Sequence, residues 1–419
     1  MIQIIKSKAE LLNNLKTLAV FILASFIFMG CNDSKEGKFL KTGNWKLVFS
    51  IGAEELPVLL SVTDTAIYII NGLEKIKVDE FEFLEDSIII KLPVYDTEIR
   101  AKLENGNLYG NWYNYTRSSF GIIPVTAFYG LDKRFIAVQE PLFDISGKWE
   151  IDFISQDDSG NVKLRKALGV FSQEGAKVTG SILTPTGDYR FLEGIVDGKE
   201  VKLSSFNGAS VYLFTANISE DGFQGMYYSG IHHQQQWQGK RNEQFKLPDS
   251  DTLTRQAIDI PVAFSFPGLD GELFQYPNPE YNGKVVILQL MGSWCPNCLD
   301  ESLLFSQWHK KYKSDGLEVI ALAFENTDDF QKSKQSVERL KNRIEANYTF
   351  LIAGKSDKQQ ASEMLPFLDK VMAFPTTVFI DKQGKVRKIH TGFSGPATGA
   401  AYEEFVTETI GFLEGLLKE

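Results

Sequence analysis

Hydrophobic and polar positions alternate with a period of two along residues 43–245. Segment 43–49 (GNWKLVF) recurs as 147–153 (GKWEIDF), and 108–113 (LYGNWY) is echoed by 223–228 (FQGMYY). The first pair places Trp, an aliphatic residue and Phe on alternate positions, which is typical of a half-buried strand. The repeated order of these landmarks predicts two tandem units built from strands.

Turn-forming segments separate the strand-length runs in both units, for example 105–107 (NGN) and 220–222 (EDG). Such punctuation favours antiparallel meanders over helices. We therefore predict a duplicated, all-β antiparallel domain, a barrel or a sandwich, with repeat unit 1 at 43–140 and repeat unit 2 at 141–245.

Beyond a polar linker at 246–255, the pattern changes to continuous apolar runs that alternate with helical stretches. Apolar runs at 284–291 and 316–324 predict buried strands, with a helix at 296–313 between them. Further predicted elements are helices at 328–346, 358–368 and 400–417 and strands at 348–352, 376–380 and 386–389. This order predicts an α/β domain over 256–419, with a central sheet covered on both faces.

The first 30 residues resemble a signal peptide. Residues 17–29 are apolar and uncharged, and the basic segment before them carries Lys6, Lys8 and Lys16 against Glu10. The apolar run is too short for a comfortable membrane span. We therefore expect residues 1–30 to direct export.

Gly30-Cys31 matches the small residue and cysteine at the cleavage point of bacterial lipoprotein signals. We predict lipidation of Cys31, a tether over 31–42, and attachment as a lipoprotein on the periplasmic side of the cell envelope. The sequence leaves open whether the inner or the outer membrane holds the anchor. An uncleaved anchor helix with a buried Cys31 is the alternative.

The net charge argues against nucleic acid as a partner. The formal charge of the 419-residue chain is -10, and it becomes -12 without residues 1–30, which carry three lysines and one glutamate. No block of five or more Lys or Arg occurs. Nothing in the chain can therefore neutralise a row of phosphates.

The other two of the three cysteines lie in the segment Trp294-Cys295-Pro296-Asn297-Cys298. Because proline is tolerated best at the first helical position, Cys295 is expected at the mouth of the helix. Free backbone N–H groups and the helix dipole stabilise a thiolate there. We predict that Cys295 is the nucleophile of disulfide exchange, that Cys298 resolves the mixed disulfide, and that the two form a disulfide.

A zinc site would need a second cysteine pair or suitably spaced histidines. The four histidines, His232, His233, His309 and His390, form no such partner motif. We therefore predict no metal and no cofactor.

The Trp-Cys-Pro-x-Cys junction, the segment 374–381 (FPTTVFID) and the final amphipathic helix together resemble a thioredoxin fold. An insertion at 326–373 resembles that of the membrane-anchored bacterial thiol-disulfide oxidoreductases of the TlpA/ResA type. The resemblance covers about 256–419 and does not extend to the β units.

This resemblance implies several roles. Pro375 would be a cis proline facing the disulfide, with a trans proline at a strand start as the alternative, and Phe374, Trp294 and Pro296 would contact the substrate. The expected partners are exported proteins that carry disulfides and a membrane-bound thiol protein that donates electrons. Reduction of the exported proteins is the expected direction.

Thioredoxins keep a buried acid six residues before the first cysteine, but Gln289 occupies that position here and cannot titrate. Glu325, at the end of a predicted strand, is the candidate base towards Cys298, or else a solvated strand-end glutamate. Asp300 and Glu301 would oppose the thiolate if they lie near the sulfurs, or simply complement the helix dipole.

Two other function classes remain open. A peroxiredoxin-like peroxidase would use the same fold, although its reactive cysteine is not normally half of a CxxC pair. The chain could instead be a binding lipoprotein, whose β domain holds a ligand or partner and whose redox domain is accessory.

Overall fold

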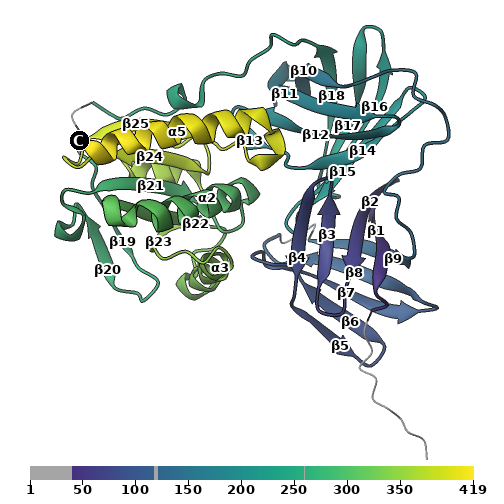
Figure 1. The fold of residues 1–419 in the computed structure, drawn as a ribbon, viewed down its shortest axis with the longest axis horizontal. Coiled ribbons are helices and arrows are strands. Elements are labelled where there is room, and N and C mark those ends of the chain that lie inside the picture. The colour runs from purple at the N-terminus through teal and green to yellow at the C-terminus, as the bar shows by residue number, and fades with distance from the viewer. Residues whose placement is uncertain (1–39, 118–120, 259) are drawn as a thin grey trace, which may run out of the picture. The chain divides into compact units, whose positions relative to one another are not determined.

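The computed structural model describes residues 40–117, 121–258 and 260–419 (Figure 1). The predicted signal peptide and the predicted lipidation site Cys31 lie outside the described residues. Within the described part of the chain, no helix is both long and apolar enough to cross a membrane.

The first β unit is a nine-stranded antiparallel meander in which neighbours in sequence are mostly neighbours in the sheet. The strand order is β4-β3-β2-β1-β9-β8-β7-β6-β5, so β1 and β9 join its two halves. The strands are β1 (Gly43–Ile51), β2 (Glu54–Val62), β3 (Ile67–Asn71), β4 (Glu74–Val78), β5 (Phe81–Leu84), β6 (Ser87–Lys91), β7 (Thr97–Glu104), β8 (Asn107–Asn114) and β9 (Ile122–Tyr129).

The second β unit is a nine-stranded antiparallel sheet that closes on itself. Its order is β11-β10-β18-β17-β16-β15-β14-β12-β13, and an additional pairing of β11 with β12 makes it a barrel. The strands are β10 (Gly147–Gln156), β11 (Val162–Glu174), β12 (Lys177–Thr184), β13 (Gly187–Asp188), β14 (Leu192–Asp197), β15 (Glu200–Phe206), β16 (Val211–Ser219), β17 (Gly222–Ser229) and β18 (His233–Arg241).

The first strand of each unit uses its tryptophan in the same way. Trp45 and Trp149 are both buried, and each indole N–H donates to the carbonyl four residues upstream, on Lys41 and Ile145 respectively, at 2.8 Å. Both side chains therefore belong to the core of their unit. Duplication of one ancestral unit stays a prediction.

Glycines in β8 and β17 allow a close approach to the neighbouring strand. Gly110 pairs with Ala101, and Gly225 pairs with Ala216. A Cβ on Gly225 would lie 1.8 Å from the carbonyl oxygen of Thr215, so this position admits only glycine without a shift of the strand. Both units thus require a glycine at the position that the repeated sequence pattern marks.

Buried polar contacts join the two β units. The Asn71 amide donates to the carbonyl of Phe206 at 2.8 Å, and the buried Arg134 guanidinium donates to Ser204 Oγ at 2.9 Å and to the carbonyl of Pro57. Phe49 packs on Phe206, with 4.7 Å between ring centroids. Buried groups satisfied in this way are costly to separate.

The α/β domain is built on a five-stranded sheet of order β23-β22-β21-β24-β25. Strands β21 to β23 are parallel, and β24 and β25 run antiparallel to their neighbours. Its elements are β21 (Val285–Met291), α2 (Pro296–Tyr312), β22 (Leu317–Glu325), α3 (Phe330–Arg343), β23 (Thr349–Lys355), α4 (Lys358–Met364), β24 (Thr376–Ile380), β25 (Val386–Thr391) and α5 (Ala400–Lys418). Every residue of β21 is buried, as predicted for a sheet covered on both faces.

Two predicted helices are shorter in the structure. Asp329 caps α3 by accepting from two backbone N–H groups, and Glu345 with φ of 50° ends it, so 328–346 shrinks to Phe330–Arg343. The second, α4, ends at Met364 because Leu365 precedes a proline, which disfavours helical backbone. A hairpin of four-residue strands, β19 (Phe264–Pro267) and β20 (Leu273–Tyr276), was not predicted because such short runs give little periodic signal.

Candidate functional site

The two cysteines lie in the first turn of α2. Cys295 is the N-cap residue, and its Sγ accepts a hydrogen bond from the backbone N–H of Cys298 at 3.4 Å. Pro296 occupies the first helical turn, where its missing N–H has no partner to lose. The predicted position of Cys295 at the mouth of the helix is therefore confirmed. Both cysteines are free thiols here.

The Phe374–Pro375 peptide bond is cis, and it faces Cys295. The Cys295 thiol lies 3.5 Å from the carbonyl oxygen of Phe374. Trp294 packs edge-on against Phe374, and its indole N–H donates to the carbonyl of Phe324 at 2.9 Å. The structure thus brings the side chains of the predicted substrate face, Trp294 and Phe374, together beside Cys295.

Cys298 is completely buried. Burial raises the pKa of its thiol well above the ordinary value, and the neighbouring Cys295 raises it further. Cys298 therefore needs a nearby proton acceptor before it can act as a nucleophile.

Glu301, one turn after Cys298, is the buried acid of the site. Its carboxyl is fully buried and accepts from the Gln289 amide at 2.8 Å and from Thr377 Oγ1 at 2.9 Å. Ser302 Oγ donates to the other end of the Gln289 amide at 3.0 Å. Burial raises the pKa of Glu301 to about 8, against the lowering effect of its two hydrogen bonds, and its charge acts on Cys298.

Glu325 has a different partner from the one predicted. Its carboxylate accepts from the backbone N–H and from the hydroxyl of Ser293, both at 2.7 Å, and burial raises its pKa. Among the described residues, no hydrogen bond joins this carboxylate to Cys298. Glu325 is buried rather than solvated. Its two hydrogen bonds to Ser293 hold the loop that leads into the cysteines.

Comparison with known proteins agrees with this arrangement. Residues 257–389 match a family model described as the AhpC/TSA family. The C-terminal domain is a thioredoxin-like domain of this family.

The relatives of the thioredoxin-like domain carry redox names. The chain is 30% identical over 113 residues to the thiol-disulfide oxidoreductase ResA of Geobacillus kaustophilus, covering 27% of this chain and 58% of that protein. It is 27% identical over 143 residues to ResA of Halalkalibacterium halodurans, covering 34% and 73%. The solved structure of StoA from Bacillus subtilis matches at 19% identity and a TM-score of 0.26, covering 36% of this chain and 98% of that one.

A residue of the second β unit contacts the first turn of α2, between the two cysteines. Arg190 is buried, and its guanidinium donates to the carbonyl of Pro296 at 3.0 Å. The same guanidinium forms ion pairs with Asp300 of α2 and with Glu74 of the first β unit. One cation therefore joins both β units to the redox helix, and Asp300 is neutralised rather than directed at the sulfurs.

The short hairpin around β13 lies against the same face of the thioredoxin-like domain. The Asp188 carboxylate accepts from the backbone N–H of Gly395 at 2.6 Å, and its carbonyl accepts from the Asn297 amide at 3.4 Å. Gly392 packs against the backbone of Thr186. This hairpin therefore contacts both Asn297 of α2 and the segment that follows β25.

A cleft of about 880 Å³ lies beside the segment that contains the cysteines. The thioredoxin-like domain contributes Trp294 and Pro296, and the β units contribute Tyr95 and Tyr212 among others. Burial raises the pKa of Tyr212 to about 12, and Cys295 acts on both tyrosines through its charge. The β units thus form one wall of the cleft beside the dithiol.

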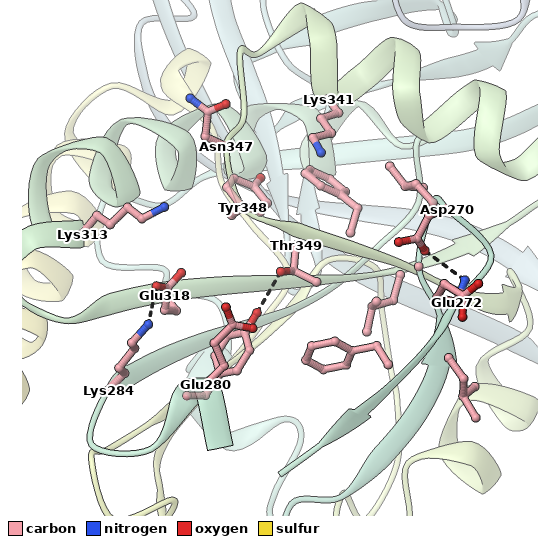
Figure 2. Close-up of a pocket in the computed structure, with 17 residues that line it drawn as sticks. Asp270, Glu272, Glu280, Lys284, Lys313, Glu318, Lys341, Asn347, Tyr348 and Thr349 are labelled. Atoms are coloured by element: carbon pink, nitrogen blue, oxygen red, sulfur yellow. Dashed lines mark hydrogen bonds and ion pairs between the residues drawn. The ribbon is translucent and has the colours of Figure 1, made fainter. Parts of the chain in front are cut away.

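A second cavity, of about 750 Å³, lies at the opposite edge of the sheet (Figure 2). Lys284 precedes β21 and pairs with Glu318, the second residue of β22, at 2.9 Å, and Thr349 begins β23. Cys295 follows the carboxyl end of β21, so this cavity is remote from the dithiol.

Among the described residues, no group of three or more His, Cys, Asp or Glu could hold a metal ion.

The sequence singled out the cysteines, Trp294, Phe374 and Pro375, which the structure brings together, but it gave Glu301 only a minor role. The useful signal was Gln289, because an amide in place of the expected acid indicates that the acid comes from another element. The sequence did not indicate a role for Arg190, Tyr95 or Tyr212. Their proximity to the cysteine segment depends on how the β units pack against the thioredoxin-like domain, which no local pattern predicts.

Proposed function

We propose that this protein is a thiol-disulfide oxidoreductase that works by dithiol-disulfide exchange at Cys295 and Cys298. The observation that carries the proposal is the first turn of α2, where an N-cap thiol lies beside a buried second thiol and the Phe374–Pro375 bond. The relatives that match this domain over part of their length are named thiol-disulfide oxidoreductase, and this supports the same activity.

In the first step, the Cys295 thiolate attacks one sulfur of the substrate disulfide. A mixed disulfide forms on Cys295, and the other substrate sulfur leaves as a thiolate that takes a proton from solvent. Trp294 and Phe374 border the reacting sulfur and bind the substrate chain beside it.

In the second step, Cys298 loses its proton and attacks the Cys295 sulfur. This forms the Cys295–Cys298 disulfide and releases the second substrate thiol, so two electrons pass from the protein to the substrate. We assign the proton to Glu301, whose pKa of about 8 is suited to exchange near neutral pH. Glu325 keeps the Ser293 loop in place and is not needed as the base.

We further propose that the protein acts outside the cytoplasm, anchored through a lipidated Cys31, and reduces disulfides of exported proteins. A membrane-bound thiol protein would restore the dithiol. The basic and apolar segments of residues 1–30 support export. We also propose that the chain divides into β repeat unit 1 (43–140), β repeat unit 2 (141–245), a linker (246–255) and the thioredoxin-like domain (256–419).

The midpoint potential of the Cys295/Cys298 couple tests this function. We expect purified protein, equilibrated against dithiothreitol or glutathione buffers, to show a two-electron couple near or below about -270 mV, the thioredoxin value. A value near about -120 mV would instead make the protein an oxidant that installs disulfides. Cys295→Ser should abolish exchange, and Cys298→Ser should trap the mixed disulfide.

Peroxide consumption by the same samples distinguishes the proposed oxidoreductase from a peroxidase. A peroxidase would oxidise Cys295 to a sulfenic acid, with release of water, and Cys298 would then close the disulfide with loss of a second water. Reduction of peroxide much faster than of any disulfide would contradict the proposed activity.

A further inference from the structure

The cleft beside the dithiol has the size of a small-molecule site. Its volume of about 880 Å³ lies within the range of ligand pockets, about 300–1,000 Å³. The β units contribute the loop before β7, the end of β8 and the start of β16, and the thioredoxin-like domain contributes the segment around Trp294, the residues after β22 and the helix α3. A large folded partner would have to displace one of these walls.

Little of Cys295 is open to solvent. Cys295 is only 7% exposed, and the β13 hairpin covers one side of its loop through Asp188 and Asn297. Trp294 and Pro296, which flank Cys295 in sequence, both line the cleft. The cleft therefore lies directly beside the segment that carries Cys295.

The cleft has an excess of positive charge although the chain is acidic. Arg339 pairs with Asp96 at 3.6 Å, and Glu325 is directed to Ser293. Arg117 and Lys332 also line the cleft, and neither has a carboxylate partner among the described residues. Two cations thus remain available to a ligand.

The hydrogen bond between Arg117 and His232 does not neutralise this charge. The ring of His232 accepts from the guanidinium, and burial together with Arg117 lowers the pKa of His232 to about 4. His232 is therefore uncharged at neutral pH, and it orients Arg117 without cancelling its charge.

We propose that this cleft selects small or flexible disulfides that carry carboxylates, with Arg117 and Lys332 binding the carboxylates while Cys295 attacks the sulfur. The proposal rests on the proposed function and names its substrate class. The disulfide could belong to a low-molecular-weight thiol or to an unfolded acidic peptide segment, which share this chemistry.

Three small disulfides of different charge test the selection. The reduced full-length protein is mixed with 4,4′-dithiodibutyrate (anionic), 2-hydroxyethyl disulfide (neutral) or cystamine (cationic). Each rate constant is divided by that of the same disulfide with dithiothreitol, which removes intrinsic reactivity. We expect the order anionic, neutral, cationic, with about a fivefold step for each partly exposed ion pair at low salt.

Removing the two cations should abolish the order. In Arg117→Ala/Lys332→Ala the three normalised rates should agree within about twofold, with the neutral disulfide unchanged, and Lys332→Glu should favour the cationic disulfide. Lys334→Ala is the matched control, because it removes the same charge from α3 at a position that does not line the cleft. It should leave the order intact.

Oxidised glutathione represents the low-molecular-weight disulfides, and a linear acidic peptide with an internal disulfide represents the unfolded peptide segments. The probe that is reduced faster identifies the source of the substrate disulfide. Equal normalised rates for the three small disulfides, or a folded protein disulfide reduced as fast as these probes, would overturn the inference. If no disulfide oxidised the dithiol at all, the proposed function itself would fail.

Discussion

The buried carboxyl of Glu301 is supplied by a helix and not by the strand that precedes the cysteines. The strand position that would carry the acid holds Gln289, and the carboxyl comes from α2 instead, hydrogen-bonded to that amide at 2.8 Å. Thr377 of β24 supplies the second donor. The three side chains meet beneath the cysteines although they are far apart in sequence.

The Glu301→Gln variant should slow the release of substrate thiol by about 100-fold, a typical size for a lost proton acceptor. In the wild-type protein this rate should rise with pH and level off above about 8, because only the ionised carboxylate can take the Cys298 proton. The variant should lack this inflection, which single-turnover kinetics from pH 6 to 9 can measure. Mixed-disulfide formation on Cys295 is the control and should change little.

An unchanged pH profile in Glu301→Gln would assign the proton to another group. Glu325→Gln then becomes the informative variant, because burial also raises the pKa of Glu325.

At the scale of elements, strand pairing in the β units depends on close backbone contacts. Gly225 in β17 pairs with Ala216 in β16, and its missing Cβ leaves space for the carbonyl of Thr215. The β strands of this barrel can therefore approach each other more closely there than side chains normally permit.

We expect Gly225→Ala to destabilise the protein by roughly 1–3 kcal/mol, because the new methyl overlaps the backbone of β16. Gly411→Ala is the matched control: Gly411 lies in α5 with open space around it, and alanine there should stabilise by up to about 1 kcal/mol. Urea unfolding of both variants measures the two effects. Equal effects would show that the strand contact carries no strain.

At the scale of the whole molecule, Arg190 connects three parts of the chain at one buried point. Its side chain is 8% exposed, and the Glu74 and Asp300 side chains are 10% and 13% exposed. Charges buried to this degree depend on each other, since each carboxylate loses its compensation if the cation is removed.

Arg190→Met should destabilise the protein by about 3–5 kcal/mol, the usual cost of leaving buried charges unpaired. The triple variant Arg190→Met/Glu74→Gln/Asp300→Asn should recover most of this loss, because it removes the carboxylates as well. Denaturant unfolding followed by far-UV circular dichroism tests both. A triple variant no more stable than the single one would mean that packing of the arginine stem dominates.

The sequence predicted elements better than it predicted their assembly. Period-two alternation and apolar runs identify strands such as β1 and β21, because burial leaves a local pattern. The Cys295 turn was predictable because proline and N-cap preferences are local too. The contacts of Arg190 with α2 were not predictable, since they depend on how separate sheets pack.

The hydrogen bond from Arg190 to the carbonyl of Pro296 has a thermodynamic consequence. This carbonyl belongs to the first turn of α2, between the two cysteines whose sulfurs join on oxidation. Docking of the β barrel and the redox state of the pair are then linked equilibria, and linkage is reciprocal. Any preference of the docked barrel for the dithiol would shift the reduction potential, and oxidation would loosen the barrel by the same free energy.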